Sequence, residues 1–186
     1  MSCTQQPQGA AEYLCRFREI LEEMISGMTT APLTDSLSHN FIVQMIPHHQ
    51  AAIEMSQNIL QYGPCAPLRE IAQNIITEQT KSIADMREAL PTCETMKNDC
   101  QDICRYRRRF QQIIQTMFRE MGNAPADCNL NADFMREMIP HHMGAIRMSQ
   151  NALNFPICPE LYPILQAIIT SQEKGVREMR RLLQCM

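Results

Sequence analysis

Residues 41–60, FIVQMIPHHQAAIEMSQNIL, recur at residues 134–153 as FMREMIPHHMGAIRMSQNAL, and the rest of the chain aligns around this repeated stretch. Thirteen of the twenty positions are identical, including the pentapeptide MIPHH. An offset of 93 residues continues the alignment to both sides without a gap, which indicates a tandem duplication. Because the repeat is far longer than that of a solenoid protein, we expect two halves, residues 1–93 and 94–186, that pack as one domain about a pseudo-twofold axis.

Each half is predicted to form three helices. A composition rich in Met, Leu, Ile, Gln and Glu and lacking Trp favours helices over strands. Apolar spacing and turn residues place helices at about 10–28, 35–62 and 67–91 and again at about 99–121, 127–154 and 159–184. We therefore predict an all-α fold, in which the two MIPHH helices and the two third helices form a four-helix bundle with two additional helices. Two separate three-helix lobes are the alternative.

The repeated stretch carries four of the five histidines. On a helix of 3.6 residues per turn, Met45, His48 and Met55 lie on one stripe, and His49 lies on its edge. Pro47 falls inside this helix, where it removes a backbone hydrogen bond, so we expect a kink in both copies. Two such helices facing each other across the pseudo-twofold axis would bring the four imidazoles close together.

Imidazole and thioether groups together form a soft ligand set that suits Cu(I), whereas carboxylate-poor surroundings disfavour Mg²⁺, Ca²⁺ and Mn²⁺. Packing offers an alternative explanation, because methionine fills irregular core space and a neutral histidine can be satisfied by a hydrogen bond. Two adjacent histidines with a methionine three residues before and seven residues after the first occur in both halves. This repetition favours metal binding over packing alone.

The two motifs, FIVQMIPHHQAAIEMSQ and DFMREMIPHHMGAIRMSQ, resemble those of a bacterial helical-bundle group, domain of unknown function family 305. The third-helix pattern of Gln79, Ile83 and Met86 is echoed by Gln172, Val176 and Met179, and it extends the likeness over nearly the whole chain. The resemblance implies a ferritin-like four-helix arrangement and, for some members, copper binding through the Met and His of these motifs. Carried over by position, it nominates eight metal ligands: Met45, His48, His49, Met55, Met138, His141, His142 and Met148.

These observations predict a non-enzymatic metal-binding protein that buffers Cu(I) or passes it to a copper-handling protein partner, and they leave a homodimer open. One alternative is a structural or interaction bundle whose histidines satisfy one another in the core. Another is a ferritin-like di-iron oxidase, which requires carboxylates from all four helices of the bundle. The oxidase is disfavoured because Glu54 of the first half aligns with Arg147 of the second.

Charge and hydropathy exclude other classes of protein. A formal net charge of -3 gives no general attraction to nucleic acid or to anionic membranes. No apolar segment approaches the roughly 20 residues needed to cross a bilayer, so membrane insertion is not expected. The first residues lack a basic stretch followed by an apolar run, which predicts a cytoplasmic location, or an exported one if a native leader precedes this sequence.

Nine cysteines are an odd number, so they cannot all pair within one chain. Cys65 and Cys158 occupy equivalent positions in the two halves, and Cys93 and Cys185 nearly do. Buried thiols that act as small apolar side chains, disulfides, and soft-metal ligands are three interpretations of this pattern.

Overall fold

The computed structural model describes residues 7–127 and 129–186, and within them the chain forms six α-helices and no strand. In chain order the helices are α1 (Pro7–Thr30), α2 (Leu37–Leu60), α3 (Ala66–Cys93), α4 (Cys100–Gly122), α5 (Leu130–Ala152) and α6 (Leu161–Leu183). Every predicted helix is found, with ends within about three residues of the expected ones. The all-α fold class is therefore confirmed.

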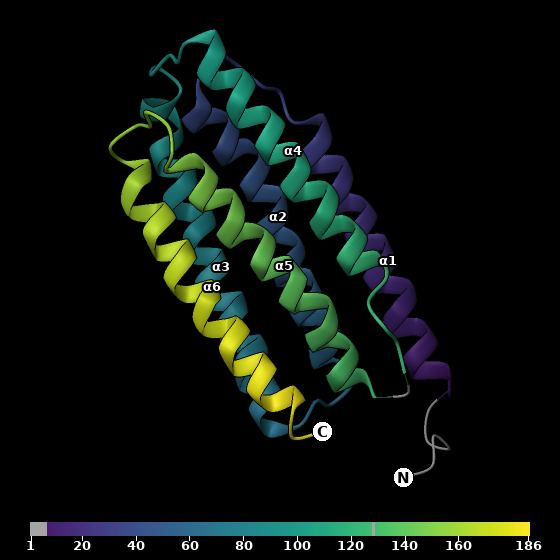
Figure 1. Ribbon diagram of the computed structural model, residues 1–186. Helices are drawn as coiled ribbons and strands as arrows, with labels where there is room; N and C mark the ends of the chain where they lie inside the picture. The colour runs from purple at the N-terminus through teal and green to yellow at the C-terminus, as the bar shows by residue number, and fades with distance from the viewer. Residues whose placement is uncertain (1–6, 128) are drawn as a thin grey trace.

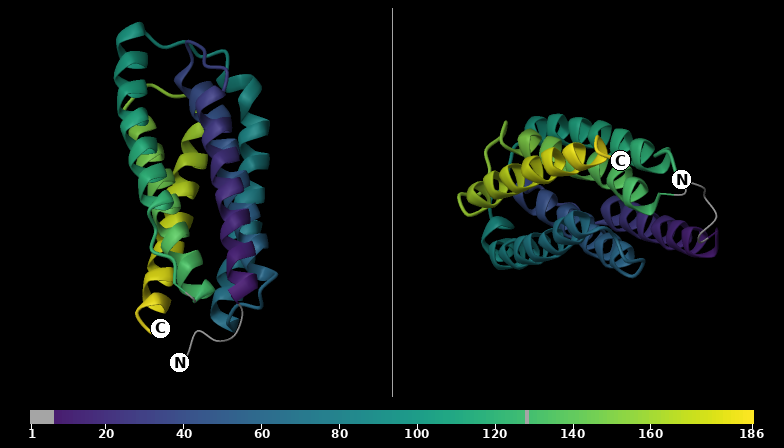
Figure 2. Two further views of the ribbon diagram at one scale, coloured as in Figure 1. Left: turned by 90° about the vertical axis from the view of Figure 1, so that its right-hand side faces the viewer. Right: turned by 90° about the horizontal axis from the view of Figure 1, so that it is seen from below.

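The six helices form two layers, each made by one half of the chain (Figures 1 and 2). The two layers meet where α2 packs on α5 and α3 packs on α6, while α2 also packs on α3 and α5 on α6. These four helices close the predicted bundle, and α1 and α4 flank it against α2 and α5. The chain is thus not divided into two separate lobes. The ferritin-like arrangement of the four-helix bundle stays a prediction.

Short polar side chains cap the N-termini of α2 and α5 at the places that the sequence indicates. The Ser36 hydroxyl accepts a hydrogen bond from the backbone N–H of His39 at 3.2 Å, and this fixes the start of α2. Asn129, 93 residues later, caps α5 by accepting from the backbone N–H of Ala132 at 3.3 Å. Both MIPHH helices are therefore placed in the same register by equivalent caps.

The pseudo-twofold relation also holds for contacts between helices. The Asn58 side-chain amide donates to the backbone carbonyl of Tyr13 at 3.1 Å and ties α2 to α1. The equivalent Asn151 donates to the backbone carbonyl of Tyr106 at 3.3 Å and ties α5 to α4. Both bonds are buried, so each outer helix is fixed against its MIPHH helix in the same way.

One continuous apolar core runs through both layers and includes side chains from all six helices. Pro47 and Pro140 lie inside α2 and α5, and both helices continue through them; the expected kinks stay predictions. Gly27 of α1 makes room for the first proline, because a Cβ atom at this glycine would lie 2.7 Å from the Cβ of Pro47.

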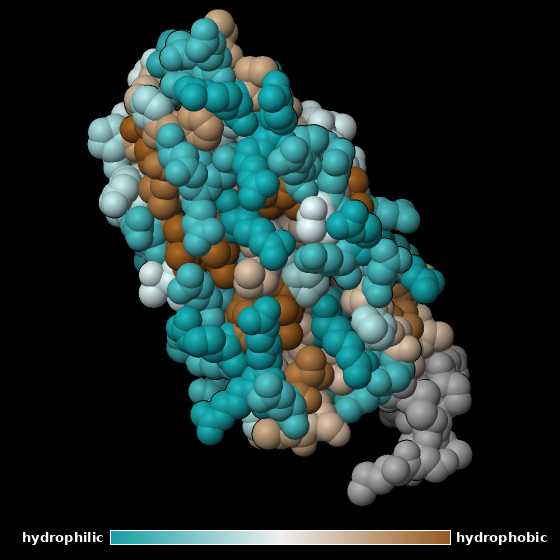
Figure 3. Space-filling model, viewed as in Figure 1, coloured by the Kyte–Doolittle hydropathy of each residue, from teal (hydrophilic) through white to brown (hydrophobic). Residues whose placement is uncertain are grey.

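The face shown in Figure 3 is mostly hydrophilic, with apolar strips between the helices. Of the helices described, none is both long and apolar enough to cross a membrane.

Candidate metal site

The four histidines of the MIPHH motifs meet where α2 packs on α5. The His48 and His141 rings are stacked, with centroids 3.7 Å apart and planes at 29°. Each ring also neighbours the other histidine of its own motif, His49 at 5.8 Å and His142 at 5.9 Å between centroids. The predicted convergence of the two motifs is therefore found, and the imidazoles form one cluster across the pseudo-twofold axis.

All four rings are buried, and most of their nitrogens lack a hydrogen-bond partner. His141 Nε2 lies 3.1 Å from the backbone carbonyl oxygen of His48, and His49 Nε2 lies 3.1 Å from the Ser82 hydroxyl. Five buried ring nitrogens have no partner: Nδ1 and Nε2 of His48, and Nδ1 of His49, His141 and His142. Each unpaired buried polar group costs about 1–3 kcal/mol, so packing alone does not explain why the cluster is polar.

The cluster is uncharged near neutral pH. Burial lowers the pKa of His49 to about 3 and that of His141 to about 4. Burial also lowers the pKa of His48 and of His142 well below the ordinary value for histidine, and the neighbouring imidazoles add to the effect. A neutral imidazole keeps a lone pair on one nitrogen, which is the form that binds metals.

The two halves of the cluster are not identical. Ser82 of α3, whose hydroxyl pairs with His49, is replaced by Gly175 at the equivalent position of α6. A Cβ atom at Gly175 would lie 3.0 Å from Cδ2 and 3.1 Å from Nε2 of His142, so the glycine admits this ring close to the α6 backbone. His142 thus has no hydroxyl partner like that of His49. The sequence interpretation missed Ser82, although its spacing of three residues from Gln79 places both on one face of α3.

The four predicted methionine ligands are all in the core, with exposed fractions of 2% or less: Met45, Met55, Met138 and Met148. Met45 precedes His48 and His49 by three and four residues, so it lies one helical turn from both. The structure thus places all eight nominated side chains in the interior and brings the four imidazoles together. Metal coordination by the sulfurs and nitrogens stays a prediction.

A surface cleft between α3 and α6 leads to the cluster. It has a volume of about 190 Å³, and His49 and Ser82 form part of its wall. The side chains of Gln79 and Gln172, one from each half, also line it, and each has a buried Oε1 atom without a hydrogen-bond partner. The cleft therefore brings solvent close to His49, and its wall carries polar side chains beside that histidine.

Carboxylates are not gathered around the imidazoles. Glu137 of α5 is buried, but its Oε2 accepts a hydrogen bond from the Tyr13 hydroxyl at 2.6 Å. Glu54 pairs with Arg16 at 2.8 Å. Within residues 7–127 and 129–186, no group of three or more His, Cys, Asp or Glu ligand atoms lying within 4.8 Å of one another includes a histidine. Among the described residues, the carboxylates of Glu54 and Glu137 are thus engaged by Arg16 and Tyr13 and not by the imidazoles.

Comparison with known proteins finds relatives of the same fold. Residues 18–90 and 38–183 match the model of a family described as domain of unknown function (DUF305). The structure of CopM in the apo form is 28% identical, covers 79% of this chain and 96% of its own, and has a TM-score of 0.58. CopM in an Ag-bound form obtained by soaking is 26% identical, covers 82% and 97%, and has the same TM-score of 0.58.

A DUF305 fragment from Deinococcus radiodurans is 20% identical over 80% of this chain and 96% of its own, with a TM-score of 0.58, and it shows the fold alone. Comparison with curated proteins found no match. Together with the CopM structures, the fragment shows that the helical arrangement described above is shared by other chains.

Proposed function

This chain belongs to the family described as domain of unknown function (DUF305), and from that premise we propose that it is a non-enzymatic copper-binding protein. It binds Cu(I) through the histidine cluster and the adjacent methionines, and it buffers the ion or passes it to another protein. The observation that carries the proposal is the set of five buried, unpaired imidazole nitrogens at the α2–α5 contact.

Soft-metal chemistry supports copper over harder cations. The MIPHH helices α2 and α5 bury neutral imidazoles and thioethers, and this donor set suits Cu(I). CopM has been solved in an Ag-bound form, and Ag⁺, like Cu⁺, is a soft monovalent cation. A bound cation would also occupy lone pairs that no hydrogen bond uses in the protein alone.

The cleft between α3 and α6 supports exchange of the ion with solvent. His49 lines the cleft together with Glu78 and with an ion pair between Asp85 and Lys81, so the charged side chains of the wall leave a net negative charge. Acidic groups raise the local concentration of a cation before it meets the histidine. An open route of this kind suits a protein that takes up and releases its metal.

The test is Cu(I) binding under anaerobic conditions with ascorbate, which keeps copper as Cu(I) and leaves the Cys93–Cys158 disulfide closed, measured by competition with a chromogenic Cu(I) chelator. Thiols also bind Cu(I), so every cysteine except Cys93 and Cys158 is replaced by serine in the protein used as reference. We expect a low stoichiometry and a rise in melting temperature that follows from binding to the folded state. His48→Ala combined with His141→Ala should abolish both.

His39→Ala is the matched control. His39 is the fifth histidine, it is also buried on α2, and the equivalent position in the second half is Ala132. This variant should bind copper as the reference does. Met45→Leu with Met138→Leu keeps side-chain volume and removes two sulfurs, so weaker binding would assign them as ligands. Unchanged copper binding in the His48/His141 variant, with lower stability, would instead identify the cluster as a structural polar core.

A further inference from the structure

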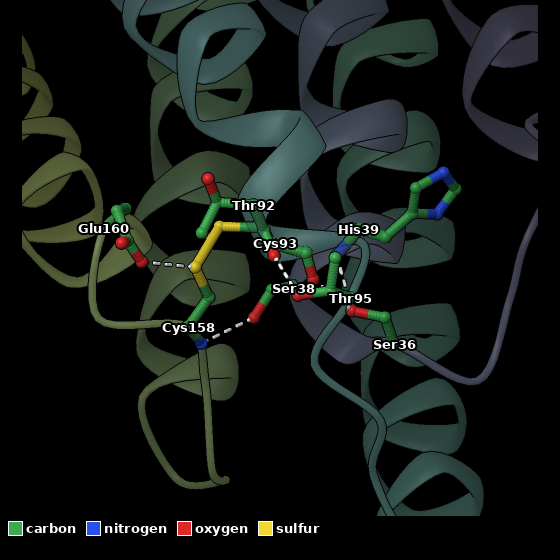
Figure 4. The surroundings of a disulfide bond; sticks show 8 residues. All are labelled: Ser36, Ser38, His39, Thr92, Cys93, Thr95, Cys158 and Glu160. Atoms are coloured by element: carbon green, nitrogen blue, oxygen red, sulfur yellow. Dashed lines mark hydrogen bonds between the residues drawn. A yellow bond between two sulfur atoms is a disulfide. The ribbon is translucent and has the colours of Figure 1, made fainter.

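A second group of metal-binding side chains lies at one end of the bundle, away from the histidines. Cys93 is the last residue of α3, Cys158 precedes α6, and the two form a disulfide with Cα atoms 5.2 Å apart (Figure 4). Both cysteines are buried, with exposed fractions of 0% and 1%. The sulfurs are near the start of α2, so about ten residues, or about 15 Å of helix, separate them from His48.

A carboxylate completes the group. Glu160 Oε2 lies 2.8 Å from Cys158 Sγ, and in the part of the chain that the structure describes, the ligand atoms of Cys93, Cys158 and Glu160 all lie within 4.8 Å of one another. Two thiolates and one carboxylate are a ligand set that Zn²⁺ accepts, at about 2.3 Å for sulfur and about 2.0–2.2 Å for oxygen. A fourth, tetrahedral position would be left to water. Glu160 is exposed, so a cation can reach the site from its side.

Hydrogen bonds that do not involve the sulfurs hold both cysteines in place. The Ser36 hydroxyl donates to the backbone carbonyl of Cys93 at 2.8 Å, and the backbone N–H of Cys158 donates to the Ser38 hydroxyl at 2.8 Å. Both serines belong to the start of α2, so the two chain segments stay beside each other when the disulfide is opened. In Figure 4 the His39 ring points away from the sulfurs, which leaves Glu160 as the third ligand.

We propose that Cys93, Cys158 and Glu160 form a zinc site that is available when the disulfide is reduced and is lost when it forms. Five other cysteines of the described chain are free thiols, and four of them are exposed. A compartment that keeps those thiols reduced also supplies dithiol reductants to this disulfide. Reduction takes two electrons and two protons from such a dithiol, which itself becomes a disulfide. Zinc then binds both sulfurs as thiolates, and their two protons pass to solvent.

The opposite end of the bundle provides an internal control. The position equivalent to Cys158 is Cys65, whose backbone N–H is held by the Asn131 side-chain oxygen at 3.0 Å, just as that of Cys158 is held by Ser38. The position equivalent to Glu160 is Pro67, so the carboxylate is missing there. Cys65 is therefore a matched cysteine without the full ligand set.

The experiment uses the full chain with every cysteine other than Cys65, Cys93 and Cys158 replaced by serine, because other thiols could also bind the probe. The disulfide is either left intact or opened by a phosphine reductant that is then removed. Co²⁺ serves as the spectroscopic probe, because thiolate ligation produces a sulfur-to-cobalt charge-transfer band, and Zn²⁺ is then added to displace it. We expect the band in the reduced protein only, its loss with one equivalent of Zn²⁺, and its absence in Cys158→Ser. Cys65→Ser should retain it.

Glu160→Gln keeps the test valid if Cys158→Ser fails to fold, because the Glu160 side chain is exposed and its removal leaves the core intact. This variant should bind zinc at least about tenfold more weakly. His48→Ala with His141→Ala should leave the cobalt band unchanged, so this proposal and the copper proposal fail or succeed separately. The same band in oxidised and reduced protein, its retention in Cys158→Ser, or unchanged zinc affinity in Glu160→Gln would overturn the proposal.

Discussion

Glu137→Gln is expected to change how stability depends on pH. Burial raises the pKa of Glu137 to about 8 from an ordinary value of 4.5, while the hydrogen bond from Tyr13 lowers it by a smaller amount. Between these pH values the unfolded chain loses a proton that the folded protein keeps, so the free energy of unfolding falls as pH rises. At about 1.4 kcal/mol for each pKa unit, the fall is on the order of 5 kcal/mol as an upper value. The contribution of the neutral carboxyl is complete below the unfolded pKa and is lost as pH approaches 8.

Glutamine cannot ionise, and it is the residue that the first half carries at the equivalent position, Gln44. The variant should match the wild type near pH 5 and exceed it by several kcal/mol near pH 8, because every other titrating group is shared. Urea unfolding followed by circular dichroism across this range measures the difference at each pH. A difference between the two proteins that does not change with pH would show that Glu137 ionises in the fold as it does in water, and would refute the reasoning.

Two further predictions each compare a substitution with a control substitution of the same kind elsewhere in the chain. Tyr13→Phe should lower the free energy of unfolding by about 1–3 kcal/mol because it removes a buried hydrogen bond to a carboxyl group. Tyr106→Phe should leave the free energy of unfolding unchanged or raise it, because the Tyr106 hydroxyl is buried without a partner and its removal relieves that penalty. Equal losses in thermal or urea unfolding would contradict this. Gly27→Ala should lower the free energy of unfolding by about 1–2 kcal/mol, because the added carbon would contact Pro47. Gly122→Ala should leave it unchanged or raise it, because nothing lies within 4 Å of the added carbon. The same unfolding assay measures both variants, and a stabilised Gly27→Ala would contradict the prediction.

The helices and their limits could be predicted from the sequence because they depend on groups close together in the chain. Ser36 caps α2 through a residue three positions away, and Pro67 falls in the first turn of α3. The spacing of Met45, His48 and Met55 along one helix fixes their common face without reference to the rest of the fold. The repeat itself predicted that a second helix would carry the same face.

Partners from distant parts of the chain could not be predicted, because helix packing and not local propensity selects them. Ser82 contacts the His49 ring in one half of the histidine cluster, and Gly175 stands at the equivalent position beside the His142 ring in the other half. The repeated stretch does not predict this difference, because both residues lie outside it. Tyr13 and Glu137 are 124 residues apart, and the disulfide joins residues 65 positions apart.

By itself, the sequence determined that this protein consists of two equivalent three-helix units, each presenting paired imidazoles and thioethers on one helix face. Only the tertiary structure decided that α2 and α5 lie against each other, so that His48 stacks on His141 in the buried interior. The physical reason is one of range: periodicity and capping act within a helical turn, whereas burial and its effect on a histidine pKa arise only when separate helices remove water from between them.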